Sequence, residues 1–314
     1  MNPIVDIKQF ASLAKLSAKP SLSILVPYYH DNPVPLIQAL AQECSERTDV
    51  EILIYDDGSG DPGLSCDVIA AVKNSAARVR LYIAEQNCGR SFARNQLFSR
   101  AKSDWVLFLD ADMRPETDHF VTDYVDLIAR DNADIIFGGF KVIAKSDDPD
   151  RELHRALSEV SDCLTLEQRR IAGPQYVCSS NLAVRKSVMI AEPFDPDFSG
   201  WGWEDSEWAA RVSKKFCLLH ADIPALHVGL ETTETLLSRF QSSGPNYLLF
   251  THKHPDLAQA LPLYRIVQKL RKVPGQKFGR PLLRAIVKLR FAPVKIRLIA
   301  LKLWRASWYA ETFA

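Results

Sequence analysis

Short apolar runs alternate with helical patterns through the first half of the chain, and this alternation constrains the fold more than any other feature. Each run is five to seven residues long and is followed by a segment with apolar residues at helical spacing. The runs are residues 23–27, 51–56, 80–84, 104–110 and 134–140. Helices are expected after Pro35, up to about Ala77, through Asn95 and up to about Asn132. This order predicts an α/β fold with a mostly parallel central sheet covered by helices.

Charge is divided unevenly along the 314 residues. The chain has 39 Lys and Arg and 38 Asp and Glu, but 13 of the cations and none of the acids lie between Leu257 and Ala310. We therefore expect three segments: an N-terminal helical lead-in over 1–20, a catalytic domain over 21–256, and a basic amphipathic helical tail over 257–314.

Cysteine usage and hydropathy point to a reducing compartment. The six cysteines have no C-x-x-C spacing, which argues against a zinc site and against a disulfide framework. The first 20 residues contain no continuous apolar region, and no run of about 18 uncharged apolar residues occurs. We expect a cytoplasmic protein without a signal peptide or spanning helix.

Two of the apolar runs end in carboxylates. One delivers Asp56 and Asp57, and another delivers Asp110 and Asp112. In parallel sheets, ligands bind beyond the carboxyl ends of the strands, and two close carboxylates repel unless a cation lies between them. Together the two segments predict a divalent metal, Mn²⁺ or Mg²⁺, that holds an anion. For Asp110 and Asp112, a turn or a helix N-cap is the alternative.

Two arginines lie between these acidic segments. Arg90 and Arg94 are four residues apart, so they share one face of the expected helix. The sequence lacks a glycine-rich phosphate-binding loop, so phosphate would depend on a metal and on arginine. The arginines face either a diphosphate or structural carboxylates.

Six segments in register resemble the family 2 glycosyltransferases of the GT-A fold. They are ILVPYYHDN, YDDGS, QNCGRSFARNQ, FLDADM, SSNLAVRKSV and FSGWGWEDSE, within residues 21–230. The resemblance implies metal-dependent, inverting transfer of a sugar from a nucleotide-diphosphate donor, with UDP expected, to an acceptor hydroxyl. Cell-surface polysaccharide or glycolipid synthesis is the expected process. The alternatives are a retaining GT-A glycosyltransferase, a nucleotidyltransferase and a non-catalytic sugar- or lipid-binding scaffold.

Residues 200–207, GWGWEDSE, combine aromatic rings with carboxylates, and we refer to them as the acidic box. Direct glycosyl transfer needs a base for the acceptor hydroxyl, and sugar rings stack on aromatic faces. By resemblance Asp205 is the general base, and Glu204 accepts hydrogen bonds from donor or acceptor hydroxyls. The expected acceptor-binding residues are Trp201, Gly202 and Trp203. Asp205 also lies where the N-cap of a helix over 206–215 belongs, so capping is a second, compatible role.

The remaining site residues follow from the resemblance. Tyr29 matches the aromatic against the nucleotide base, Asp57 the acid that bonds the base, and Asp110 the ribose contact. Pro27, Arg94 and Ala111 complete the expected donor site. The metal ligands are expected to be Asp112 and, by analogy, His227.

The basic tail has two interpretations. Its cations Arg280, Arg284 and Lys288 recur every four residues, with an apolar face opposite, and Trp304, Trp308 and Tyr309 follow. Either two helices pack on the catalytic domain, or the tail lies on an anionic membrane with its aromatic residues at headgroup level. The expected acceptor is a saccharide or a lipid-linked saccharide, and the membrane interpretation suits the lipid-linked one. Nucleic acid is not an expected partner.

Overall fold

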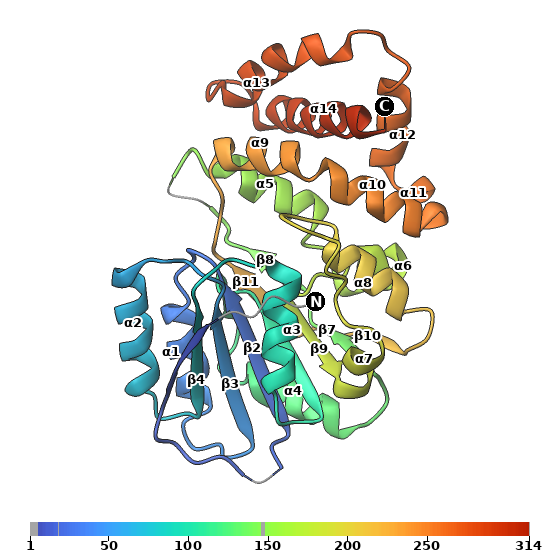
Figure 1. Ribbon diagram of the computed structural model, residues 1–314. Coiled ribbons are helices and arrows are strands. Elements are labelled where there is room, and N and C mark those ends of the chain that lie inside the picture. Colours follow the sequence, from blue (N-terminus) through green and yellow to red (C-terminus); the bar gives the residue numbers. More distant parts are fainter. Residues whose placement is uncertain (1–5, 18, 146–147, 314) are drawn as a thin grey trace.

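Eight strands form the main sheet of the computed structural model, which describes residues 6–17, 19–145 and 148–313 (Figure 1). In spatial order they are β1 (Ile7–Ala11), β4 (Val79–Ala84), β3 (Val50–Asp56), β2 (Leu22–Tyr28), β5 (Trp105–Leu109), β9 (Asn181–Arg185), β7 (Ile135–Phe137) and β10 (Leu218–His220). Strands β4, β3, β2 and β5 are parallel neighbours, whereas β9 is antiparallel to β5 and β7. The five apolar runs form β2, β3, β4, β5 and β7. The expected α/β fold is therefore confirmed.

The helical lead-in expected at the N-terminus is wrong. Within the described part of 1–20, Ile7–Ala11 forms strand β1, which pairs antiparallel with β4. An edge strand leaves backbone N–H and C=O groups unpaired, and β1 satisfies those of β4. Ile7 and Phe10 also pack against the core. Pairing with a distant strand therefore outweighs the local helical pattern.

Helices cover the sheet where the chain crosses between its strands. The crossovers are α1 (Val34–Glu43), α2 (Pro62–Lys73), α3 (Arg90–Arg100), α4 (Phe120–Ala129) and α7 (Lys186–Ala191). Helix α3 packs on β2 and β3, and α2 packs on β1 and β4. The parallel strands are buried on both sides, because the consecutive residues Ile24 and Leu25 of β2 point to opposite faces and neither has exposed surface.

A second, three-stranded sheet links Asp112 to His227. Its strands are β6 (Met113–Pro115), β11 (Ala225–His227) and β8 (Phe140–Val142), in that order. Strand β11 pairs antiparallel with β6, and His227 lies opposite Met113. This register brings the residue before β6, Asp112, beside the end of β11.

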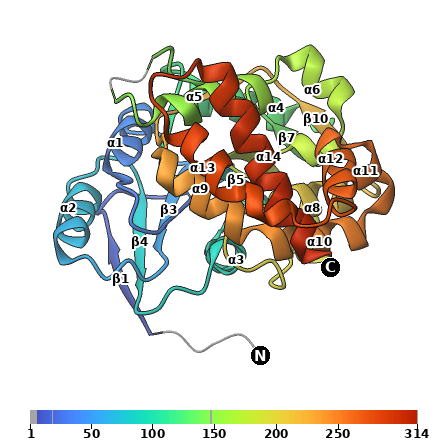
Figure 2. The same cartoon turned by 90° about the horizontal axis from the view of Figure 1, so that it is seen from above.

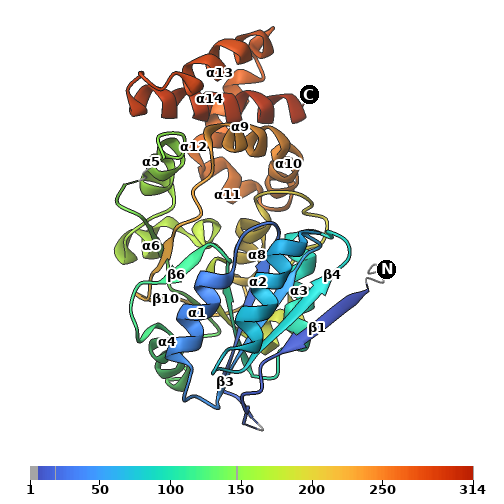
Figure 3. The ribbon, with the colours of Figure 1, turned by 90° about the vertical axis from the view of Figure 1, so that its left-hand side faces the viewer.

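The remaining helices form a layer above the sheet. They are α5 (Glu152–Ser161), α6 (Leu166–Ala172), η1 (Pro174–Tyr176), α8 (Glu204–Val212), α9 (Thr233–Ser242), α10 (Gly244–Lys253), α11 (Pro255–Ala260), α12 (Pro262–Leu270), η2 (Gln276–Gly279), α13 (Arg280–Lys288) and α14 (Val294–Thr312). Helix α14 packs on α9, α10, α12 and α13. The views from above and from the side show α13 and α14 lying over α9, at the end of the molecule away from the sheet (Figures 2 and 3).

The basic tail shares its core with the preceding helices. Trp304 and Leu301 of α14 are buried with Leu237 and Phe240 of α9, so apolar packing crosses the boundary expected after residue 256. Tyr309 is buried as well. The expectation that the aromatics of the tail lie at membrane headgroups is therefore wrong for Trp304 and Tyr309, because α14 turns them toward α9 and α10. In the described part of the chain, none of the helices has the length and apolar character needed to cross a bilayer.

Candidate active site

Arg94 lies at the centre of a cluster of carboxylates. Its side chain is 1% exposed, and Nη2 donates a hydrogen bond to Asp110 Oδ1 at 3.0 Å. Its Nη1 lies 3.4 Å from Glu204 Oε1 and 3.6 Å from Asp205 Oδ1. Burial opposes the positive charge, but the carboxylates of Asp205, Asp110 and Glu204 outweigh it and raise the pKa of Arg94. One guanidinium thus joins the end of β5 to the acidic box.

The sequence left open whether the arginines face a diphosphate or structural carboxylates, and Arg94 faces carboxylates. Its guanidinium faces structural carboxylates and is enclosed, so the structure does not present it to a diphosphate. Arg90, one turn earlier on α3, is 40% exposed and lies 4.0 Å from both Asp110 Oδ2 and Glu204 Oε1. Arg90 is therefore the cation of this pair that a bound anion can reach.

Asp205 is held by a residue to which the sequence analysis gave no role. The backbone N–H of Ser179 donates to Asp205 Oδ2 at 3.1 Å, and Ser179 Oγ donates to Oδ1 at 2.7 Å. Ser179 comes from the SSN segment before β9, which was part of the family resemblance. The Asp205 side chain keeps 21% exposure, against 5% for Glu204. Of the two acids, Asp205 is the more accessible to an acceptor.

The capping role considered for Asp205 is wrong. Helix α8 begins at Glu204, and the residue before it, Trp203, has φ of 76° and makes no side-chain capping bond. Asp205 is therefore in the first turn and turns its carboxylate to Ser179 instead of to the backbone of its own helix. Negative charge in a first turn still benefits from the helix dipole. Burial and the adjacent Asp205 raise the pKa of Glu204, whereas Arg90 and Arg94 oppose that shift.

Asp112 and His227 form the second part of the site. His227 Nε2 lies 3.1 Å from Asp112 Oδ2. Burial raises the pKa of Asp112, but the hydrogen bond and charge of His227 outweigh it and lower that pKa overall. The backbone approaches Asp112 at Gly229, where a Cβ would lie 2.2 Å from Oδ2, so glycine is needed there.

This pair fits a divalent metal by the chemistry of its donors. A carboxylate oxygen is a ligand that Mg²⁺ and Mn²⁺ prefer, and an imidazole nitrogen binds transition metals. The other ring nitrogen, Nδ1 of His227, is buried without a hydrogen-bond partner. In the described residues, no third His, Cys, Asp or Glu joins the pair to make a larger cluster. Asp112 and His227 stay the two predicted ligands of a metal.

The residues expected at the nucleotide lie along the end of β2 and β3. Tyr29 follows β2 and is 46% exposed, which leaves its ring available for stacking. Pro27 lies in β2, and Ala111 is buried after β5. The carboxylate of Asp57 is engaged by the backbone, since it accepts hydrogen bonds from the N–H groups of Cys88 at 3.1 Å and Gly89 at 2.8 Å.

Asp57 therefore has a structural role that the sequence did not reveal. Its bonds hold the turn that begins α3, and burial raises its pKa to about 6 although these bonds oppose the shift. Gly58 completes this contact: its φ is 76°, and a Cβ there would lie 2.4 Å from the carbonyl carbon of Gln86. The predicted contact of Asp57 with a nucleotide base stays a prediction.

The tryptophans of the acidic box pack against the helical layer. Trp203 lies against Tyr247 and Phe250 of α10, and its Nε1 donates to the hydroxyl of Tyr309 in α14 at 3.1 Å. Trp201 packs edge-on against Phe240 of α9. Their packing shows a structural role, and their predicted acceptor role is untested. Gly202 has φ of 88°, and its carbonyl accepts a hydrogen bond from Asn246 Nδ2, which fixes the loop.

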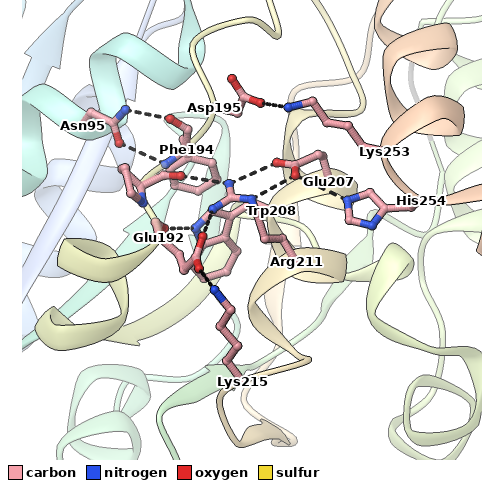
Figure 4. Close-up of polar contacts among 11 residues, drawn as sticks. Asn95, Glu192, Phe194, Asp195, Glu207, Trp208, Arg211, Lys215, Lys253 and His254 are labelled. Atoms are coloured by element: carbon pink, nitrogen blue, oxygen red, sulfur yellow. Dashed lines mark hydrogen bonds and ion pairs between the residues drawn. The ribbon is translucent and has the colours of Figure 1, made fainter.

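A buried ionic network anchors the helix that carries Asp205 (Figure 4). Glu207 of α8 accepts a hydrogen bond from Arg211 at 2.9 Å, and its carboxylate lies 3.3 Å from Nε2 of His254, the residue between α10 and α11. Arg211 also pairs with Glu192 at 2.5 Å, and Trp208 Nε1 donates to the Glu192 carbonyl at 2.7 Å. Trp208 is 1% exposed and belongs to the core. Because these bonds reach neighbouring elements on both sides, α8 presents the acidic box from a rigid support.

Comparisons with known proteins identify the family of this chain. The family model described as glycosyl transferase family 2 matches residues 23–191. The chondroitin synthase of Escherichia coli is 25% identical over 231 residues, which cover 62% of this chain and 32% of the synthase. The amylovoran biosynthesis glycosyltransferase AmsB of Erwinia amylovora is 29% identical over 94 residues, 29% of this chain and 31% of AmsB. The chain thus spans about a third of the length of the curated relatives it matches.

Solved structures show the same fold. The mannosyltransferase PcManGT from Pyrobaculum calidifontis, in complex with GDP-Man and Mn²⁺, has a TM-score of 0.53 at 14% identity, over 95% of this chain and 88% of that one. S. aureus TarS 1–349 in complex with UDP-GlcNAc has a TM-score of 0.54 at 16% identity, over 93% and 91%. The family match favours a glycosyltransferase over the nucleotidyltransferase and scaffold alternatives. The chain belongs to glycosyltransferase family 2, with the GT-A fold.

Proposed function

We propose that the protein transfers a sugar from a nucleotide-diphosphate donor, with UDP as the expected nucleotide, to an acceptor hydroxyl with inversion of configuration. The observation that carries this proposal is the contact of Arg94 with Asp110, Glu204 and Asp205. It places the expected ribose-binding acid and the expected base on one buried cation, although about a hundred residues separate them in the sequence.

Asp205 is the base in this proposal. It takes the proton of the acceptor hydroxyl while the acceptor oxygen bonds to the anomeric carbon, and the bond from that carbon to the diphosphate oxygen breaks. Its accessibility relative to Glu204 supports this assignment. Ser179 positions the carboxylate through two hydrogen bonds. Glu204, enclosed by Arg94, would preserve the charge balance of the cluster.

Asp112 and His227 are the residues that would hold a divalent metal, Mn²⁺ or Mg²⁺. When bound, such an ion supplies positive charge that stabilises the departing diphosphate. Arg90 is exposed beside Asp110 and would add a second cation for the same anion. Two structural neighbours, one in complex with GDP-Man and Mn²⁺ and one with UDP-GlcNAc, support a nucleotide-sugar donor.

The acceptor in this proposal is a saccharide or a lipid-linked saccharide in cell-surface polysaccharide or glycolipid synthesis. Relatives named for chondroitin and for amylovoran synthesis support polysaccharide formation. A lipid-linked acceptor would bring the enzyme to the cytoplasmic surface of a membrane as a peripheral protein.

The test is Asp205→Asn, with Asp197→Asn as the matched control. Asp197 is exposed in the loop before the acidic box, so the control removes a nearby carboxylate outside the cluster. Nucleoside diphosphate release would be measured with a panel of UDP- and GDP-sugars and Mn²⁺. Donor binding would be measured in parallel by thermal shift.

Turnover of Asp205→Asn should fall roughly 10²-fold or more while donor binding stays near that of the unsubstituted protein. Asp197→Asn should leave both unchanged. Unchanged turnover in Asp205→Asn would remove Asp205 from the reaction and leave it a structural ligand of Ser179 and Arg94.

A further inference from the structure

The turn between α13 and α14 exposes large apolar side chains. Phe291 is 97% exposed, Leu289 52% and Ile296 50%. We refer to residues 289–296 as the hairpin tip. Leu282 on α13 and Ile299 on α14 extend the exposed apolar surface along both helices, at 66% and 60%. Isolated exposed apolar residues are ordinary, but five in one helical hairpin mark an interaction surface.

The cations of α13 form ion pairs with neighbouring helices. Arg280 is buried, with its guanidinium 3.7 Å from the centre of the Trp308 ring, and it pairs with Glu311. Arg284 and Lys288 pair with Glu234 of α9. These ion pairs attach the hairpin to the helical layer, on which Ile286 and Val287 of α13 also pack. Leu282 of α13 is left exposed.

The charge around the hairpin tip limits what can cover it. Arg290 and Lys295 are exposed within the tip, and residues 257–310 contain no acid. A second copy docking tip to tip would bring these like charges together. A surface of anionic lipid headgroups offers both the opposite charge for the cations and an apolar interior for the side chains.

The position of the hairpin in the fold suits a membrane. The pair α13–α14 lies at the end of the molecule away from the sheet, with α9 between them and the rest (Figures 1 and 3). Trp201 of the acidic box packs on α9, so the carboxyl edge of the sheet is on the same side as the hairpin. A protein bound through the tip would turn its candidate site toward the membrane.

We propose that the hairpin tip inserts Leu289 and Phe291 into an anionic lipid surface, with Arg290 and Lys295 at the headgroups. This deepens the membrane association that forms part of the proposed function, by assigning the residues that make it. Vesicle binding needs neither donor nor acceptor, so its failure is distinguishable from failure of the glycosyl transfer.

The experiment is co-sedimentation of the full chain with vesicles of phosphatidylcholine alone or mixed with phosphatidylglycerol, at low and high salt. Two double variants test the tip: Leu289→Ser with Phe291→Ser, and Arg290→Gln with Lys295→Gln. The matched control is Ile171→Ser, which removes an 87% exposed apolar side chain on α6. Because all the substituted side chains are exposed, thermal unfolding should be unchanged and the variants should remain folded.

The unsubstituted protein should bind the anionic vesicles, and salt should weaken this binding. Each tip variant should lose about tenfold or more in apparent affinity, and Ile171→Ser should bind normally. Brominated lipid should quench the tryptophan fluorescence of Phe291→Trp more than that of the unsubstituted protein, which contains only the native tryptophans. Equal binding by tip variants and unsubstituted protein, or no binding at low salt, would overturn the proposal. Self-association of the unsubstituted protein that the tip variants lose would assign the surface to a second copy.

Discussion

Arg94 and Arg90 allow a matched test of what a buried cation does in this site. Both project from α3 toward Asp110 and Glu204, one turn apart. They differ in burial, since the side chain of Arg94 is 1% exposed and that of Arg90 is 40% exposed. Substituting each by Met removes the charge while keeping most of the side-chain volume.

The expected magnitudes differ because of this burial. Arg94→Met leaves three carboxylates without their shared partner, and breaking a buried ion pair costs about 3–5 kcal/mol. Arg90→Met removes contacts at 4.0 Å from a solvated side chain, which are worth less than about 1 kcal/mol. The free energy of unfolding should therefore fall several-fold more for Arg94→Met than for Arg90→Met.

The pH dependence of the Arg94→Met effect has a defined sign. The pKa of Glu204 is already above its usual range, and losing Arg94 removes a group that holds it down. A carboxyl whose pKa is higher in the folded than in the unfolded state destabilises the fold at neutral pH, and the loss is relieved as the pH falls. The cost should therefore be largest near pH 7 and shrink toward acid pH.

The assay is urea unfolding followed by circular dichroism, at several pH values, together with donor binding by thermal shift. Donor affinity should fall more for Arg90→Met than for Arg94→Met, because Arg90 is the exposed cation that the diphosphate of the donor can reach. Equal losses of stability for the two variants, or a cost for Arg94→Met that grows with acid, would refute the reasoning that burial of Arg94 organises the cluster.

Three further predictions concern the metal, pH and stereochemistry. Asp112→Ala, or treatment with chelator, should abolish donor binding and turnover, because the diphosphate would face Asp110 without a compensating ion; full activity in chelator would contradict this. Burial lowers the pKa of His220 to about 4. As the pH falls below about 6.5, the unfolded chain binds a proton at this histidine that the folded protein binds only near pH 4, so the free energy of unfolding should fall between pH 6.5 and pH 4. In His220→Gln the slope of the unfolding free energy against pH should decrease by the equivalent of up to about one proton. An unchanged slope would show that His220 does not cause the loss of stability. The product should have the anomeric configuration opposite to that of the donor, and an NMR coupling constant showing retention would favour the retaining alternative.

Much of the sheet and part of the site could be predicted from the sequence. The five apolar runs became strands; Asp56 ends β3 and Asp110 directly follows β5, so both acids lie at the carboxyl edge. This worked because hydrophobic periodicity is a property of the segment itself, and because parallel strands end at a common edge. The six motifs indicated the family, and the matching family model confirms the family.

Contacts between distant segments could not be predicted in the same way. The partner of Arg94 depends on how α8 packs against α3, and Ser179 reaches Asp205 only through the position of β9. The predicted start of the helix that carries Asp205 was wrong by two residues, because α8 begins at Glu204, directly after Trp203 in a left-handed conformation. Such contacts combine residues from several elements, and no local pattern encodes them.

The sequence by itself determined the α/β class, the acidic strand ends, the family and the basic character of the tail. Only the tertiary structure decided that Ile7–Ala11 is a strand, that Arg94 is enclosed by carboxylates and that the cations of α13 pair with acids of α9 and α14. Periodicity and composition describe which faces a segment has. Which face becomes buried depends on the surface that another segment offers, here the open edge of β4, the first turn of α8 and Glu234 on α9.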